Sequence, residues 1–241
     1  AAAAINCSSP DKQESYKPEA DSLRYEEEKH LRNIRQLTFG ANNAEAYWSF
    51  DDSKLILQSD NPEWGLGCDQ IFYIDLSETQ TPGQELPMVS TGEGRTTCSF
   101  FLPDNETFVY ASTHLGGKAC PEVPERGPGG AYVWPIYDTY DIFKANLNGE
   151  LIEQLTDEPG YDAEAVVSPD GSKIVFTSTR NGDLDLYIMD VDGSNVVQVT
   201  DELGYDGGAF FSPDGTKLVF RSSRPETEAE ISRYKELLEQ G

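Results

Sequence analysis

Apolar and polar residues alternate in short runs through the second half of the chain, which is the pattern of half-buried β-strands. The runs, in order, are residues 165–168, 173–178, 185–190 and 195–200. A Pro-Asp-Gly turn signal at 169–171 follows the first run, and Asp192-Gly193 precedes the last. The pattern therefore predicts four consecutive antiparallel strands.

This unit is repeated. Residues 154–180 and 198–224 align over their whole length, 44 positions apart. A fixed period of about 40 residues with four strands per unit is the signature of a β-propeller blade, which buries its faces only by stacking on other blades. Two degenerate copies precede, at 47–57 and 99–110. The turn aspartates are Asp51, Asp104, Asp170 and Asp214, spaced 53, 66 and 44 residues apart. The unequal spacing indicates insertions in equivalent loops.

Both ends of the array lack strands. Residues 34–38 match the outer strand of the later units, whereas 209–222 supply only the first two strands of a fourth unit. Residues 225–240 instead show helical spacing of apolar residues, with Pro225 in the first turn. We predict an all-β propeller over residues 31–241 with a helical insertion at 225–240. It contains about three and a half blades, below the usual four to eight, and we expect a longer propeller to complete it.

The composition of the chain argues against some classes of function. The chain has 43 acidic and 18 basic residues, a formal net charge of −25. This charge argues against nucleic-acid binding and against adhesion to anionic lipid, since both need a basic face. No apolar run approaches the ~20 residues of a membrane span. The composition agrees with a protein of the cell envelope or the extracellular space.

Residues 1–30 read as a flexible acidic tail, because residues 8–30 are charged and poor in aliphatic side chains. The segment before it, Ala1 to Cys7, resembles the end of a bacterial lipoprotein signal, although Asn6 precedes the cysteine where a smaller residue is usual. Cys7 is therefore a lipidation candidate, and the tail a candidate lipoprotein tether. The alternative is an ordinary tail cysteine.

Three further cysteines fall in related places. Cys68 and Cys120 lie between the second and third strands of units one and two, and Cys98 lies at the start of an inner strand. These positions share one face of a propeller, so we predict a disulfide in which Cys98 pairs with Cys68 or Cys120. The alternative is three buried free thiols.

The loop of unit two, residues 114–137, is 22 residues longer than its counterpart in unit three. It contains His114, Tyr132, Trp134 and Tyr137, and aromatic side chains offer a large contact area at low entropic cost. We predict a recognition loop over the channel mouth that uses these four residues. The alternative is a lid whose aromatic side chains pack on neighbouring blades.

Catalytic motifs are missing from the sequence. There is no Gly-x-Ser-x-Gly elbow, no His-Glu-x-x-His and no phosphate-binding loop, and the only histidines are His30 and His114. Residues 190–195 superficially resemble a calcium loop but fit a strand-connecting turn better. Asp162, Glu164, Asp183 and Asp185 form an acidic group near the loops of one unit, which we interpret as a solvated acidic rim; the alternative is a cation site. The sequence predicts no catalytic residue, metal site or cofactor.

The runs Ser168 to Phe176 and Asp185 to Asp190 resemble the WD-type repeats of TolB-like proteins, and Ser212 to Phe220 repeats the first. The resemblance covers roughly residues 34–224. It implies a six-bladed propeller, usually periplasmic, that acts by contacts with envelope proteins and not by catalysis. We predict a non-enzymatic interaction scaffold of the bacterial envelope, facing the periplasm or the exterior. The alternatives are the propeller part of a larger hydrolase or peptidase, and a module that binds carbohydrate, peptide or calcium.

Overall fold

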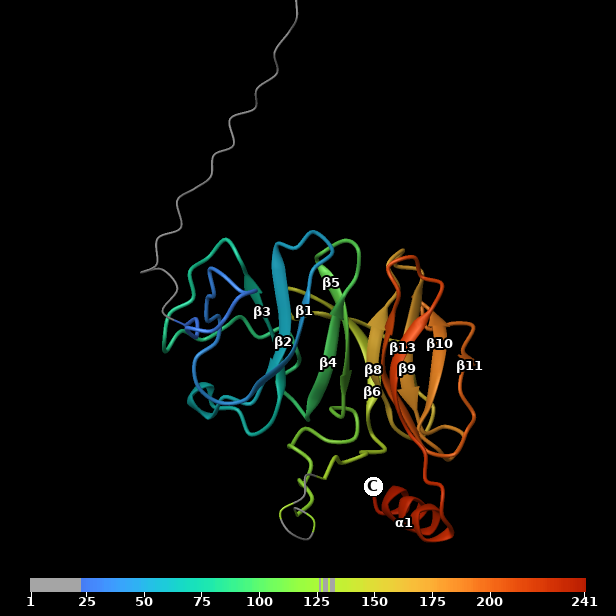
Figure 1. Ribbon diagram of the computed structural model, residues 1–241. Helices are drawn as coiled ribbons and strands as arrows, with labels where there is room; N and C mark the ends of the chain where they lie inside the picture. The colour runs from blue at the N-terminus through green and yellow to red at the C-terminus, as the bar shows by residue number, and fades with distance from the viewer. Residues whose placement is uncertain (1–22, 126, 128–129, 131–132) are drawn as a thin grey trace, which may run out of the picture.

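In the computed structural model of the protein, the residues described are 23–125, 127, 130 and 133–241. Its strands form antiparallel sheets that follow one another along the chain and stand side by side (Figure 1). Blade one contains β1 (Asn43–Trp48), β2 (Lys54–Ser59) and β3 (Gln70–Asp75); blade two contains β4 (Thr96–Phe101), β5 (Thr107–Ser112), β6 (Asp141–Asn146) and β7 (Leu151–Gln154); blade three contains β8 (Asp162–Val167), β9 (Lys173–Ser178), β10 (Asp185–Asp190) and β11 (Val197–Gln198); blade four contains β12 (Tyr205–Phe211) and β13 (Leu218–Ser223). The predicted all-β propeller fold is confirmed.

The Pro-Asp-Gly turns are held by side chains that lie close in sequence. In blade three the Asp170 carboxylate accepts hydrogen bonds from the Ser168 hydroxyl at 2.6 Å and the Ser172 amide at 3.0 Å. The Ser168 hydroxyl in turn accepts from the Lys173 amide at 2.9 Å. These bonds lower the pKa of Asp170 to about 2, and Asp51 and Asp214 show the same arrangement and the same pKa. The repeated motif therefore specifies the turn between the first and second strands.

The repeated Gln-x-Thr triplets have a structural role as well. The Asp185 carboxylate, at the start of β10, accepts hydrogen bonds from Thr200 Oγ1 and Gln198 Nε2, both at 3.1 Å. Asp141, at the start of β6, accepts from Thr156 Oγ1 at 3.3 Å and Gln154 Nε2 at 3.2 Å. Burial raises the pKa of Asp141 to about 6. Each triplet thus ties an outer strand to the third strand of its blade.

Apolar side chains from facing blades form the core. The cluster between blades two and three includes Val109, Ile142, Ile174 and Phe176, and equivalent clusters fill the spaces between blades one and two and between blades three and four. The outer faces of the first and last blades have no neighbouring blade among the described residues, and Val219 on β13 is 69% exposed. Burial therefore depends on blade stacking, as the sequence predicts.

Residues 34–38 do not form the predicted outer strand. Within the described chain no third strand is free to pair with them, because β3 is bridged to Met88, β6 pairs with β7, and β10 pairs with β11. Leu37 instead packs against the apolar cluster on the outer face of blade one. Blade one accordingly has three strands and an isolated bridge.

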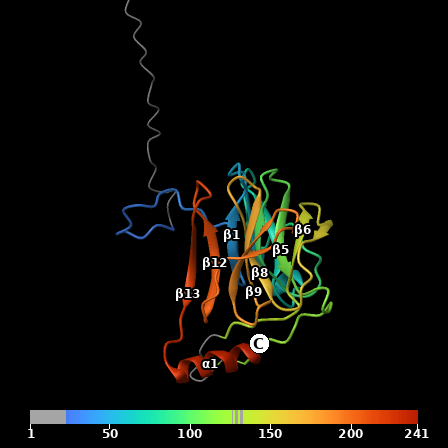
Figure 2. The same ribbon diagram turned by 90° about the vertical axis from the view of Figure 1, so that its right-hand side faces the viewer.

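The predicted helix is present as α1 (Glu228–Glu239). Thr227 caps it, accepting from the Glu230 amide, while the Glu230 side chain accepts from the Thr227 amide. Pro225 lies before this capping box and not in the first turn, which corrects the prediction. The helix crosses the same end of the blades as the long loop of blade two (Figures 1 and 2). The structure also describes a short 3-10 helix, η2 (Pro62–Trp64). Within the described residues no helix is long and apolar enough to cross a membrane, and α1 itself has 12 residues.

Candidate functional site

A β-bulge occurs at the same place in all four first strands. The pairing register shifts there, and the residue in the bulge adopts a left-handed backbone conformation. These bulge residues are Glu45, Cys98, Glu164 and Gly208, with φ angles of 51°, 43°, 59° and 59°. The first strands of neighbouring blades lie against one another, so the bulges line one cavity of about 760 Å³, here called the channel cavity.

Glu164 is the most buried of these groups, with 6% of its surface exposed. Its carboxylate accepts hydrogen bonds from Thr177 Oγ1 at 2.6 Å, the Gly208 amide at 3.0 Å and the Tyr205 hydroxyl at 3.2 Å. Burial raises the pKa of Glu164 against the effect of these bonds. The side chain therefore joins the bulges of blades three and four, which is a structural role.

The mouth of the channel cavity combines aromatic rings with a guanidinium group. The Trp134 ring lies 6.0 Å from the Tyr205 ring. The guanidinium of Arg221 stands 5.2 Å from the centre of the Tyr205 ring and 6.0 Å from that of Trp134. Trp134 remains 38% exposed. The loop residue thus packs on blade four and still presents part of its ring to solvent.

The channel cavity also contains an ion pair. Arg95 pairs with Asp69, and both residues line the channel cavity. Burial raises the pKa of Asp69, while the charge of Arg95 lowers it. Arg95 Nε is buried and has no hydrogen-bond partner among the described residues. The cavity therefore contains two arginines, of which one is neutralised by a carboxylate.

The long loop is tied to blade one by a disulfide. Cys68 and Cys120 are bonded, with their Cα atoms 5.9 Å apart, and Cys98 is a free thiol. A disulfide among the three candidates was predicted, but its assignment to Cys98 is wrong. Cys98 occupies a bulge and lines the channel cavity, whereas the other two lie in loops at the end of the blades. Burial also raises the pKa of the Cys98 thiol well above its usual value.

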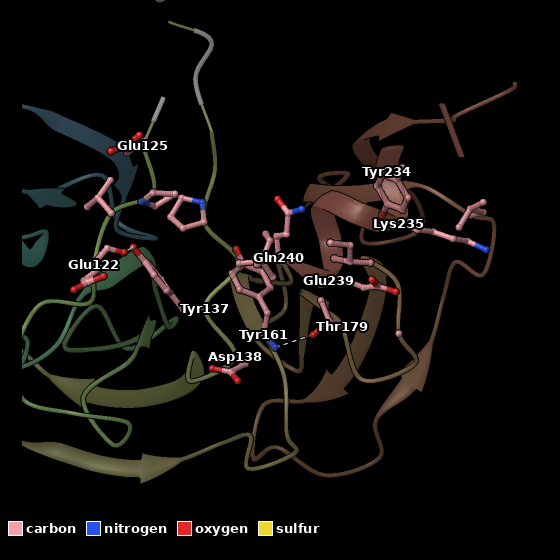
Figure 3. Close-up of a pocket in the computed structure, with 18 residues that line it drawn as sticks. Glu122, Glu125, Tyr137, Asp138, Tyr161, Thr179, Tyr234, Lys235, Glu239 and Gln240 are labelled. Carbon is pink, nitrogen blue, oxygen red and sulfur yellow. Dashed lines mark hydrogen bonds between the residues drawn. The ribbon is translucent and has the colours of Figure 1, made fainter. Parts of the chain in front are cut away.

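A second cavity, here called the helix-side cavity, has a volume of about 970 Å³ (Figure 3). One wall is residues 122–125, the second is 135–138 and the third is the C-terminal part of α1. Tyr137 donates a hydrogen bond to the Glu122 carbonyl at 2.7 Å, and the Ile136 amide donates to the Gly241 carbonyl at 3.0 Å. Pro135 and Tyr137 line both cavities and separate them.

The predicted site residues are only partly brought together. Trp134 lines the channel cavity and Tyr137 lines both cavities, and Tyr132 is outside the described residues. His114 lines neither, because its ring packs 4.4 Å from that of Phe143 and its Nδ1 lies 2.9 Å from Ser112 Oγ. Burial lowers the pKa of His114, which disfavours its cationic form.

The predicted acidic rim is not solvated, because Asp162, Glu164 and Asp185 are buried and bonded within the protein. Asp162 pairs with Arg180 at 2.9 Å, Asp183 accepts from the Tyr234 hydroxyl, and Asp185 is held by Thr200 as described above. Among the described residues no group of three potential ligands has the geometry of a metal site.

Tyr205 and Arg221 were not predicted as site residues. The sequence does contain a signal for Tyr205, because it aligns with Tyr161 and both begin the run into an inner strand. Arg221 gives no such signal, since Thr177 occupies the equivalent position in the preceding repeat. Its place at the mouth depends on the packing of β13 beside the long loop.

Comparison with known proteins agrees with this architecture. Residues 131–235 match the family model described as TolB beta propeller domain. The chain is similar to the structure of TolB from Acinetobacter baumannii, with 20% identity and a TM-score of 0.51 over 78% of this chain and 39% of that chain. Oligogalacturonate lyase from Vibrio parahaemolyticus is similar with 16% identity and a TM-score of 0.53, over 80% of this chain and 50% of that one.

A chain in a nidogen/laminin complex is also similar, with 14% identity and a TM-score of 0.50, over 73% of this chain and 55% of that one. At these identities the likeness shows the fold alone. The match spans well under half the length of the Acinetobacter TolB chain.

Proposed function

We propose that this chain, a TolB-like β-propeller protein, is a non-catalytic interaction scaffold of the bacterial cell envelope. Its partner contacts would be made by the channel mouth, defined by Trp134, Tyr137, Tyr205 and Arg221. The partner is an envelope protein, and no cofactor or nucleic acid takes part.

The partly exposed Trp134–Tyr205–Arg221 group that lines the channel cavity carries this proposal. Tryptophan, tyrosine and arginine are the residues that most often dominate the energy of protein interfaces, especially around a pocket that excludes water. Because the rings already pack against one another, little side-chain freedom is lost on binding. A preformed surface of this kind suits protein recognition.

A non-catalytic role is supported by the bonding of the acidic groups around the channel cavity. Glu164 is held by three hydrogen bonds within the blades, Asp69 is paired with Arg95, and Glu45 accepts from the Tyr47 hydroxyl. A catalytic acid or base needs to reach a substrate proton. These carboxylates are instead occupied by the propeller itself. The likeness to a lyase is one of fold and supports no activity here.

An envelope location is supported by the Cys68–Cys120 disulfide, since such bonds persist in oxidising compartments. We place the protein in the periplasm or on the outer face of the envelope. Residues 1–30 would act as a flexible acidic tether, attached through a lipid at Cys7; Cys7 and the rest of residues 1–22 are outside the described residues.

The test is capture of envelope proteins by immobilised full-length protein, with Trp134→Ala compared with Val197→Ser. Val197 is 61% exposed on the outer strand β11 and serves as the control for a lost apolar side chain. We expect Trp134→Ala to lose a partner that binds saturably to the wild type and to the control. Both variants should melt within about 3 °C of the wild type, because neither side chain is fully buried. If Trp134→Ala captures the same proteins in the same amounts, the channel mouth is not the contact surface.

A further inference from the structure

We propose that the helix-side cavity binds a basic peptide segment, in which a lysine or arginine lies next to an apolar side chain. This inference deepens the proposed function, because it names the chemistry of one partner segment. The helix-side cavity shares Pro135 and Tyr137 with the channel cavity, but Trp134, Tyr205 and Arg221 line the channel cavity only, so the two proposals can fail separately.

The size of the cavity sets the class of ligand. The cavity is open to solvent and has a volume of about 970 Å³ between residues 122–125, residues 135–138 and α1. Sites of ~300–1,000 Å³ hold ligands of drug size or a few peptide residues. In Figure 3 the side chain of Tyr137 stands on one side of the space and those of Tyr234 and Glu239 of the helix on the other, with Tyr161 between them. A bare ion would leave most of this space to water.

The charge of the lining selects a cation. Four carboxylates line the cavity, against one lysine, Lys235. They belong to Glu122, Glu125, Asp138 and Glu239. All four residues are exposed, and within the described chain none is in a salt bridge. The protein as a whole carries a net charge of −25, which would also draw a basic segment toward it.

Apolar groups lie among these charges. Val123, Ile136, Leu203 and Leu238 line the same cavity, and Leu238 packs against the cluster of Tyr140 and Tyr161 beneath it. A ligand that only carried charge would leave these side chains in contact with water. A segment with an apolar side chain beside its charge would cover them.

The floor of the cavity contains an unused polar group. Tyr161 is 1% exposed, and its hydroxyl has no hydrogen-bond partner among the described residues. Figure 3 shows its ring directed from the floor toward the space between the 135–138 segment and the end of α1. By contrast, the hydroxyls of Tyr137 and Tyr234 at the walls are already bonded, to Glu122 and Asp183. A phenol can accept a bond from an ammonium or guanidinium group, or donate one to a peptide carbonyl.

The first experiment measures fluorescence anisotropy of a labelled peptide, acetyl-Gly-Lys-Leu-Lys-Gly-amide, titrated with the full-length protein at low salt. The reference peptide has glutamate in place of both lysines. We expect saturable binding of the lysine peptide alone, weakened by added salt. Binding of both peptides with equal affinity overturns the proposal, and so does binding of spermine or Mg²⁺ without binding of the lysine peptide.

Charge variants locate the peptide. Glu122→Gln/Glu239→Gln removes two carboxylates of the cavity, and Glu78→Gln/Glu153→Gln makes the same change in net charge at exposed residues that line neither large cavity. We expect the first double variant to bind the peptide about fivefold more weakly, as for two exposed ion pairs, and the second to bind it as the wild type does. Equal losses in both variants would mean attraction by net charge alone and would overturn the site.

Tyr161→Phe tests the buried hydroxyl against Tyr187→Phe. Tyr187 is also buried with an unpartnered hydroxyl, but it packs in the core between blades two and three and lines neither cavity. Each variant should melt at or above the wild-type temperature, since a buried polar group without a partner is lost. Only Tyr161→Phe should weaken peptide binding, by about three- to tenfold. Unchanged binding in Tyr161→Phe overturns the role of this hydroxyl.

Trp134 lines the channel cavity but not the helix-side cavity. Trp134→Ala should therefore bind the peptide as the wild type does, even where it loses the captured partner. If the wild type binds the peptide but Trp134→Ala still captures the partner, the proposed function is wrong and the cavity site is retained. If the wild type does not bind the peptide but Trp134→Ala loses the partner, the proposed function is retained and the cavity site is wrong.

Discussion

The Cys68–Cys120 disulfide links the loops of two neighbouring blades, and its removal should destabilise the protein strongly. The bond joins residues 52 positions apart, so it closes a long segment that includes β3, β4 and β5. Replacing both cysteines by alanine leaves that segment free in the unfolded chain. The folded blades keep their own sheet pairing, because neither residue lies in a strand.

The size of the effect follows from the length of the closed segment. A loop of this size loses about 14 cal/mol/K of chain entropy when it is cross-linked, which corresponds to about 4 kcal/mol at 25 °C. Measured values are usually lower, so we expect a loss of about 2–4 kcal/mol in the free energy of unfolding. For a domain of this size, the melting temperature should fall by roughly 5–15 °C.

The assay is urea and thermal unfolding, followed by circular dichroism, of the wild type, Cys68→Ala/Cys120→Ala and Cys98→Ala. Reduced wild type should behave as the double variant, and Cys98→Ala should keep the melting response to reductant. Mass mapping should recover Cys98 alkylated without reduction. A disulfide peptide that contains Cys98, or a double variant within about 0.5 kcal/mol of the wild type, would refute the reasoning.

Three other perturbations test the blade chemistry. Gly193→Ala should cost about 1–3 kcal/mol in urea unfolding, because φ is +81° and the added Cβ would lie 2.7 Å from the Leu155 carbonyl oxygen. The pKa of Asp170 falls from 3.8 to about 2 on folding, so its stabilising contribution is present above pH ~4 and is lost as the pH falls through 2. The free energy of unfolding of Asp170→Asn should therefore change less between pH 2 and 6 than that of the wild type. The pKa of Asp141 is raised to about 6, so its effect has the opposite sign: stabilisation is present below pH ~4 and is lost as the pH rises through 6. An NMR titration of the Asp141 carboxyl with a midpoint below 4 would contradict this.

The order of strands and turns was predictable because the interactions that specify them are local. The Ser168, Asp170 and Lys173 bonds close within five residues, and the Gln-x-Thr triplet reaches a strand that begins about fourteen residues earlier. Such bonds recur whenever the same residues recur, so the repeat in the sequence is a repeat in the structure. The helix at 228–239 is specified in the same way by Thr227 and Glu230.

The sequence by itself thus determined the blade, its turns, the length of the inserted loop and the excess of negative charge, because each depends on neighbouring residues or on composition. Only the tertiary structure decided which cysteines pair, since the bulge of its strand places Cys98 at the channel, whereas the loops that carry Cys68 and Cys120 lie side by side. It also decided that Trp134 meets Tyr205 and Arg221, residues more than 70 positions away, while His114 turns to Phe143. These contacts depend on how blades stack and how a long loop crosses them, and no local pattern of residues encodes that path.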